Sequence, residues 1–387
     1  MRVSKRDFLR TAALLAVDSL LARDLPAKNG QKQSSSPYKV ILVIIGGMRR
    51  AETFSASGFE NIPHLAYDLG PQSLFYLTIR NEGVTAHFNA ITSILTGNWQ
   101  RVDDWGKFPP ASPTVFEFFR KQLGVAESEV WVVASNKALT NMIGASSVSQ
   151  YGPRFGANVV FPKQLLINAV MNAVWSGRRR GNADPKQIQQ ELQAMLEENN
   201  YEGLGWSVFE TRDYLAPRAR DTIKRAIARF VESEKPSTGD ALTFWIGREI
   251  MRRFAPSLLV VDFSDVEVAH FGSYSMHVAG IREADRLTYQ LWQEAQTNPA
   301  YRGRTTMVVL PEFGRDPGGS RTNGFENHRS NDDSCRSTWM MALGVGAERP
   351  RIIERPVQHI DVCPTLAAFL GCRTPGTQGR RLTEIRA

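Results

Sequence analysis

Residues 258–272 read LLVVDFSDVEVAHFG, an apolar run followed directly by a polar one. Residues 258–261 are a short apolar run of strand-forming side chains. Such a run is typical of a strand covered on both faces, as in a parallel sheet. Three carboxylates and an imidazole then follow: Asp262, Asp265, Glu267 and His270.

This change from apolar to polar residues suggests a binding site. In an open α/β sheet, ligands bind at the carboxyl ends of the strands. Carboxylate oxygens are hard donors and imidazole nitrogen is a borderline one, so the set suits a divalent metal ion. The alternative is that these acids cap a helix and solvate a loop, and the stretch alone leaves both interpretations open.

Two later segments extend the pattern. Residues 305–314, TTMVVLPEFG, form a second β-rich run with Glu312 at its end. A Gly- and Asn-rich loop follows and carries His328 in the segment NHRSND. Residues 359–372, HIDVCPTLAAFLGC, come next. β-rich runs separated by helical stretches require crossover connections, which predicts a mostly parallel sheet with helices on both faces.

The order of these segments resembles the alkaline phosphatase superfamily, which includes sulfatases, phosphodiesterases and cofactor-independent phosphoglycerate mutases. In that family one strand ends in Asp with a His a few residues later, the next ends in Asp-His-Gly, and a loop supplies a further His. The chain then closes with a segment like Asp-Ile-x-Pro-Thr-Leu-x-x-Leu-Leu-Gly. The residues that match this closing segment are Asp361, Pro364, Thr365, Leu366, Leu370 and Gly371. The resemblance implies a doubly wound α/β fold.

The resemblance also implies a first metal site that is largely kept. Its ligands would be His270, His328 and one carboxylate. The family's Asp falls on Val266, and Asp265 and Glu267 flank that position, so the choice between them stays open. We expect the donor atoms of His270 and His328 to lie roughly 3–4 Å apart, as two ligands of one ion must.

The second metal site of the family is largely lost. Its first-strand Asp is replaced by Gly46, which follows the apolar run VILVII, and its Asp-His pair by Glu312 and Phe313. Glu312 keeps a carboxylate and should lie close by, whereas an empty place is expected beside Gly46. We therefore expect one divalent ion, zinc, calcium or manganese, or none. The candidate ligands are Asp265, Glu267, His270, Glu312 and His328.

Residues 85–97, TAHFNAITSILTG, resemble the family helix that carries the nucleophile at its N-terminus. Free amide groups and the helix dipole favour an anion there. Counting back from Leu-Thr-Gly places the nucleophile position on His87, with Thr85 two residues earlier. The candidate catalytic residues are His87, Thr85 and Arg49, with His87 and Arg49 contacting the anion. Alternatively, His87 merely caps the helix.

The N-terminus is predicted to be a targeting segment. Residues 4–10, SKRDFLR, look like a twin-arginine export signal with Lys in the first Arg position, and the apolar region that follows is too short to span a bilayer. We predict that residues 1–36 are export signal and polar linker. Residues 37–387 would form one domain with a helical insertion at about 162–256. The expected location is periplasmic or extracellular, and the alternative is an amphipathic helix of a cytoplasmic protein.

Composition limits the partners. The net charge is +8, and no basic cluster is interleaved with aromatic residues, so nucleic acid is not an expected partner. The expected partner is a small anionic ester, without stable membrane insertion, and the oligomeric state stays open. Two functions remain: a hydrolase of phosphate or sulfate esters with a reduced metal site, or a catalytically inactive binding protein of the same fold.

Overall fold

Nine strands form one mixed sheet in the part of the chain that the computed structural model describes, residues 36–100, 108–135, 143–163, 165, 217–232, 238–319 and 324–386. The strands run in the order β4-β3-β5-β1-β6-β7-β2-β8, and β9 pairs with β2. Their bounds are β1 Lys39–Ile45, β2 Leu74–Arg80, β3 Val130–Ala134, β4 Asn158–Val160, β5 Leu258–Phe263, β6 Thr305–Pro311, β7 Ser337–Gly344, β8 Arg351–Ile353 and β9 Val357–Gln358.

The sheet is mostly parallel, as the sequence predicts. Strands β4, β3, β5, β1 and β6 pair in parallel with their neighbours in that order. Strand β7 is antiparallel to both β6 and β2, and it is the one reversed strand among the described strands. The carboxyl ends of β5, β1 and β6 therefore lie side by side at one edge of the sheet.

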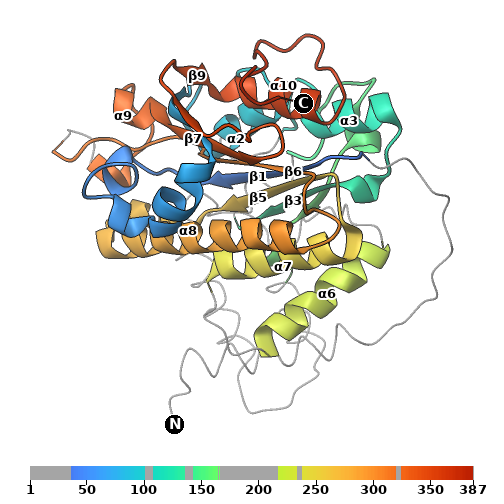
Figure 1. Ribbon diagram of the computed structural model, residues 1–387, viewed down its shortest axis with the longest axis horizontal. Helices are drawn as coiled ribbons and strands as arrows, with labels where there is room; N and C mark the ends of the chain where they lie inside the picture. The colour runs from blue at the N-terminus through green and yellow to red at the C-terminus, as the bar shows by residue number, and fades with distance from the viewer. Residues whose placement is uncertain are drawn as a thin grey trace.

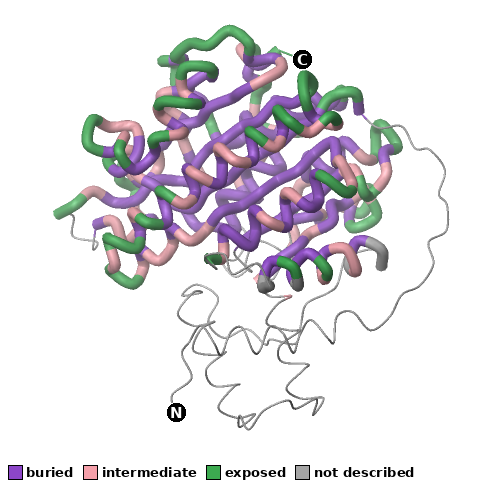
Figure 2. The backbone as a smooth tube through the Cα atoms, turned by 60° about the horizontal axis from the view of Figure 1, so that its bottom comes forward, coloured by how far each residue is buried: buried purple, intermediate pink, exposed green. Residues whose placement is uncertain are grey.

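Helices cover both faces of the sheet (Figure 1). One face packs against α2, α3 and α10, and the other against α7 and α8 with α6 beyond them. Strand β1 shows why, because its alternate side chains enter two different cores. Val40, Leu42 and Ile44 join the first core, and residues 41, 43 and 45 join the second. Buried residues accordingly follow the strands through the centre of the molecule (Figure 2).

The helices agree with the periodicity of the sequence. They are α2 His87–Thr96, α3 Val115–Leu123, α6 Pro217–Glu232, α7 Gly239–Phe254, α8 Tyr274–Thr297, α9 Asp333–Arg336 and α10 Val362–Phe369. Helix α2 ends at Gly97, which adopts φ +70° and so allows the left-handed C-cap. None of the helices in the described ranges is long and apolar enough to cross a membrane.

Part of the predicted organisation lies outside the described residues. The export segment, residues 1–35, belongs to that part, and so does most of the predicted insertion between residues 166 and 216. The division into a targeting segment, one α/β domain and a helical insertion at about 162–256 stays a prediction.

Candidate metal centre

The candidate site lies where the three central strands β5, β1 and β6 end. After β5, a 3₁₀ turn η9, Asp265–Phe271, carries Glu267 and His270. After β1, Gly46 and Gly47 turn the chain, and after β6 comes Glu312. Helix α2 brings His87 at its first residue, and the loop after the short turn η10, Gly324–Glu326, brings His328.

Four side chains converge to form what we call the donor group: His87, Glu267, His270 and His328. Each offers one ligand atom, and these four atoms all lie within 4.8 Å of one another. The Nε2 atoms of His270 and His328 are 3.1 Å apart. The Glu267 Oε2 atom lies 3.2 Å from Nε2 of both His87 and His270. The predicted approach of His270 to His328 is therefore present in the structure.

Two of these imidazoles are oriented through their second ring nitrogen. Nδ1 of His328 donates to the carbonyl of Thr85 at 2.6 Å, and Nδ1 of His87 bonds to the Glu312 carboxylate. A neutral imidazole with its proton on Nδ1 presents a lone pair at Nε2. Metal-binding histidines characteristically hydrogen-bond a carbonyl or carboxylate in this way.

The chemistry of the donor group fits a divalent ion. Three imidazole nitrogens and one carboxylate oxygen form a four-ligand set of the type zinc accepts. The Nε2 atoms of His270 and His328 are 3.1 Å apart, so a proton or a cation lies between them, and a bound ion would take the place of the proton. The group is also sheltered, since His328 is fully buried and the His87 and His270 side chains are 3% and 11% exposed.

Glu267 is held in its ionised form. Burial alone would raise the pKa of Glu267, but the Arg315 guanidinium and His87 hold it well below its ordinary range. Arg315 is fully buried, pairs with Oε2 of Glu267 and donates to the carbonyls of Gly47, Phe325 and Glu326. The amide of Gly47 donates to Oε1 of Glu267 at 2.7 Å. The carboxylate is thus fixed on both oxygens.

The sequence led us to expect an empty space beside Gly46. This expectation was wrong, because the space is filled. A Cβ atom added at Gly46 would lie 2.5 Å from Oε1 of Glu267 and 2.7 Å from a methyl carbon of Val266. Glu267 reaches across from η9 and fills the space next to the end of β1. Glycine is needed at this position because the neighbouring carboxylate leaves no room for a side chain.

The structure also separates the two carboxylates between which the sequence left a choice. Glu267 belongs to the donor group, whereas Asp265 does not. Oδ2 of Asp265 accepts from the amide of Asp240 at 2.9 Å, and the Asp240 carboxylate accepts from the amides of Ser264 and Asp265. Asp265 therefore links η9 to the start of α7 through hydrogen bonds. The prediction that Asp265 is a metal ligand was wrong.

Three further candidates take places other than those expected. Glu312 stands behind His87 on its Nδ1 side and lies outside the donor group. The carbonyl of Thr85 accepts a hydrogen bond from His328, and its hydroxyl oxygen accepts one from the Cys335 thiol. Arg49 is bound to the Glu52 carboxylate and to the carbonyl of Asp316. Of the predicted catalytic residues, only His87 belongs to the donor group.

Sequence reasoning missed Arg315 and the packing role of Phe313. Arg315 follows two positions after Phe313, and no motif marks it as the partner of Glu267. The Phe313 ring stacks on His328 with ring centres 4.3 Å apart and contacts His87. A Cβ atom at Gly47 would lie 2.7 Å from the Phe313 ring, so this glycine gives the ring its space. The pair Gly46-Gly47 was the one available signal, because consecutive glycines at a strand end indicate close approach of other groups.

Asp262, the buried acid near the end of β5, gives a prediction about pH. It is 1% exposed, and burial, with the nearby Glu312 charge, raises the pKa of Asp262 to about 8. When the pKa of a carboxyl group is higher in the folded than in the unfolded protein, the group contributes stability that is fully present below the unfolded pKa. This contribution is lost as the pH rises toward the folded pKa. We expect Asp262→Asn to raise the free energy of unfolding of metal-free protein at pH 8, relative to wild type, by on the order of 2–4 kcal/mol.

Chemical denaturation from pH 5 to pH 8, with a chelator present, would measure this effect. Glu60→Gln is the matched control, since Glu60 is exposed and the substitution should not alter the slope. If Asp262→Asn and wild type lose stability in parallel as the pH rises, Asp262 is ionised in the folded protein.

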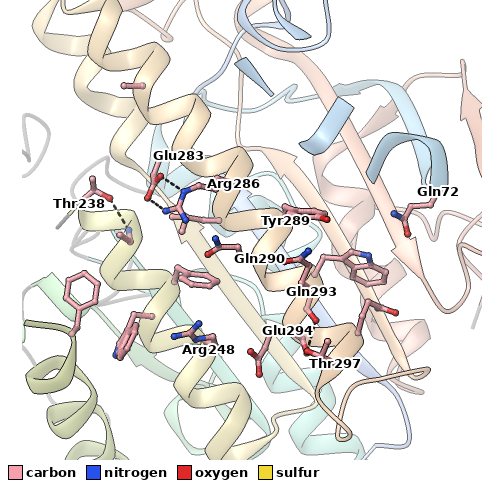
Figure 3. Close-up of a pocket in the computed structure, with 18 residues that line it drawn as sticks. Gln72, Thr238, Arg248, Glu283, Arg286, Tyr289, Gln290, Gln293, Glu294 and Thr297 are labelled. Atoms are coloured by element: carbon pink, nitrogen blue, oxygen red, sulfur yellow. Dashed lines mark hydrogen bonds and ion pairs between the residues drawn. The ribbon is translucent and has the colours of Figure 1, made fainter. Parts of the chain in front are cut away.

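A separate surface groove lies between α7 and α8 (Figure 3). None of its lining residues belongs to the donor group. Several of its polar side chains are already paired, including Glu283 with Arg286, and Glu294 with Arg252 from α7. The groove is therefore not part of the candidate centre.

The fold and the site together define a class. An open, mostly parallel α/β sheet with a polar site at the carboxyl ends of its central strands is a doubly wound fold with a site in the usual place. No protein-family model and no curated protein matches the sequence. Solved structures do match, and they show the alkaline-phosphatase-like fold that the sequence resemblance predicted.

Two of the matching structures illustrate the likeness. Wild-type alkaline phosphatase PafA superposes with a TM-score of 0.53 at 11% identity, over 92% of this chain and 100% of that one. The phosphonate monoester hydrolase SpPMH from Silicibacter pomeroyi superposes with a TM-score of 0.53 at 14% identity, over 89% of this chain and 76% of that one. At such low identity the likeness establishes the fold alone.

Proposed function

We propose that this protein is a metal-dependent hydrolase of phosphate or sulfate esters with a reduced metal site. The observation that carries the proposal is the donor group, in which three imidazole nitrogens and one carboxylate oxygen lie within 4.8 Å of one another. His87, Glu267, His270 and His328 would hold one divalent ion. An ion that keeps a further coordination position beyond these four ligands would supply Lewis acidity toward an ester oxygen and lower the pKa of a bound water.

The residues of the chain would prepare the site for an anion. Glu312 and the Thr85 carbonyl keep the protons of His87 and His328 on Nδ1, so that both Nε2 atoms stay available. Arg315 balances the charge of Glu267, which leaves the ion's positive charge for the substrate. His87 opens helix α2, whose first-turn amides favour a negative group near the same point.

The fold supports the substrate class at the level of chemistry. Two of the solved structures that the chain resembles are named as an alkaline phosphatase and a phosphonate monoester hydrolase. The small anionic ester predicted from the sequence is therefore our proposed substrate for this chain. Export to the periplasm or beyond rests on residues 1–36 and stays a prediction.

Metal analysis together with hydrolysis assays tests the proposal. Protein stripped with a chelator is reloaded with zinc, manganese or calcium, and bound metal is counted by mass spectrometry. Each form is then assayed with p-nitrophenyl phosphate, bis-p-nitrophenyl phosphate and p-nitrophenyl sulfate. We expect one ion per chain and hydrolysis of at least one ester. An ion without hydrolysis would favour a binding protein, and a chain that takes up no ion would refute the metal site.

A further inference from the structure

Two buried histidines outside the donor group make equivalent contacts. His277, in the first turn of α8, is fully buried, and its Nδ1 lies 2.8 Å from the carbonyl oxygen of Val266. His359, just after β9, is also fully buried, and its Nε2 lies 3.1 Å from the carbonyl oxygen of Pro311. Val266 immediately precedes Glu267, and Pro311 immediately precedes Glu312.

Each histidine therefore holds the peptide group that leads into one glutamate of the site. A peptide group is planar, so fixing its oxygen and its nitrogen fixes the direction in which the next residue leaves. The amide of Glu267 donates to the carbonyl of Ser264 at 3.0 Å, and the amide of Glu312 donates to the carbonyl of Ile45 at 2.9 Å. Both peptide groups are thus held at both ends, with an imidazole on the oxygen.

The protonation of both rings follows from these contacts. A carbonyl oxygen only accepts, so the ring nitrogen that faces it must carry the proton. Burial lowers the pKa of His277 to about 4, and burial also lowers the pKa of His359, so both rings are neutral at pH 7. A neutral imidazole has a single N–H group. His277 must therefore be the Nδ1–H tautomer. The backbone of Arg80 also hydrogen-bonds the His359 ring, so the positioning role of His359 requires that its one proton lie on Nε2, facing the Pro311 carbonyl.

We propose that His277 and His359 are positioning residues of the candidate centre, acting through the carbonyls of Val266 and Pro311. His277 sets the direction of Glu267, which belongs to the donor group, and His359 sets the direction of Glu312, which orients His87. The inference rests on the proposed function for its importance to activity. Its structural content, the two tautomers and the two held carbonyls, is independent of that function.

Packing around η9 explains why this hydrogen bond matters for Glu267. Helix α8 lies so close to the turn that a Cβ atom added at Gly280 would be 3.0 Å from the amide nitrogen of Val266. The hydrogen bond between Asp265 and the amide of Asp240 fixes the start of the turn, and Gly272 ends the turn with φ +72°. Between these two points His277 supplies the side-chain hydrogen bond to the peptide group before Glu267.

Nitrogen-15 NMR of the wild-type rings, in metal-free protein, tests the tautomers directly. The chain has six histidines, so the ring signals can be assigned by single substitutions. We expect Nδ1–H for His277 and Nε2–H for His359. The opposite tautomer at either position would overturn the proposal for that residue, because the facing nitrogen would then have no proton to donate.

Asn and Gln substitutions at the two histidines can either keep the hydrogen-bond donor in place or misplace it. The Asn amide nitrogen occupies the position of Nδ1 and the Gln amide nitrogen that of Nε2, relative to Cβ. His277→Asn and His359→Gln therefore keep the donor, whereas His277→Gln and His359→Asn misplace it. We expect leucine at either position to weaken metal binding about tenfold, since partners that orient ligands typically contribute 10–100-fold. The donor-keeping amides should restore affinity and the misplaced ones should not.

The outcomes separate this inference from the proposed function. If wild type binds metal and all the His277 and His359 variants bind it equally well, the positioning role is refuted while the metal site stands. If wild type binds no metal, the proposed function fails. The ring signals of His87 and His270 then become the readout, and they should shift in the leucine variants and recover in the donor-keeping amides. Unchanged signals would overturn the inference. Should a leucine variant not fold, the comparison of Asn with Gln at that position decides.

Discussion

Removing either His270 or His328 is expected to abolish metal binding. The two Nε2 atoms lie 3.1 Å apart and belong to a set of four, so alanine at either position leaves three donors for one ion. Residues that merely orient a ligand already contribute about 10–100-fold, so loss of a ligand should weaken affinity by more than about a hundredfold. Competition with a fluorescent chelator would measure the affinity, and hydrolysis of p-nitrophenyl esters should fall in parallel.

His64→Ala is the matched control for these two substitutions. Its imidazole is partly exposed, bonds Asp68 at 2.6 Å and stacks on Tyr289, away from the donor group. This variant should bind metal and hydrolyse ester as wild type does. Undiminished metal content in both His270→Ala and His328→Ala would show that the ion, if any, is held elsewhere.

Adding one methyl group at Gly46 is expected to damage both stability and metal binding. The new Cβ would lie 2.5 Å from Oε1 of Glu267, so the carboxylate must move away from the imidazoles. Overpacking of this kind costs about 1–3 kcal/mol, and the displaced carboxylate should also weaken metal affinity by about tenfold or more. Denaturant titration and chelator competition on Gly46→Ala would measure the two effects.

A double-mutant cycle assigns the damage to Glu267. In a Glu267→Ala background the carboxylate is absent, so Gly46→Ala should cost markedly less, with a coupling of about 1 kcal/mol or more. Gly247→Ala is the control, because its Cβ would meet only Val261 at 3.6 Å, and alanine favours the interior of α7. Additive costs at positions 46 and 267 would show that the two residues do not compete for space.

The fold was predictable from the sequence because it depends on local and repetitive signals. The apolar run at residues 258–261 is buried on both faces in β5, as its composition predicts. Helix α2 ends at Gly97, where the Leu-Thr-Gly segment placed its end. The direction of strand β7, which is antiparallel to β6, was not predicted, because strand direction follows from how the connections run.

The site was predictable only in part. His270, His328 and Glu267 were found because they follow strand ends in a familiar order, and His87 was found at the helix start. The choice between Asp265 and Glu267 depended on the direction in which each side chain of a tight turn points. The spacing of residues in the sequence does not determine this direction. Arg315 and the crowding at Gly46 depend on side chains meeting across the sheet edge from distant parts of the chain.

The reversal of strand β7 has a consequence for how this protein can change. Because β6 ends and β7 begins at the same edge of the sheet, the chain between them need not cross to the far side. The described residues of this connection, 312–319 and 324–336, supply Glu312, Phe313, Arg315 and His328 at that edge. Such a connection can lengthen or shorten without shifting any strand register, since surface loops tolerate insertions at small entropic cost. One segment can thus change in length while the parallel core and η9 stay unchanged.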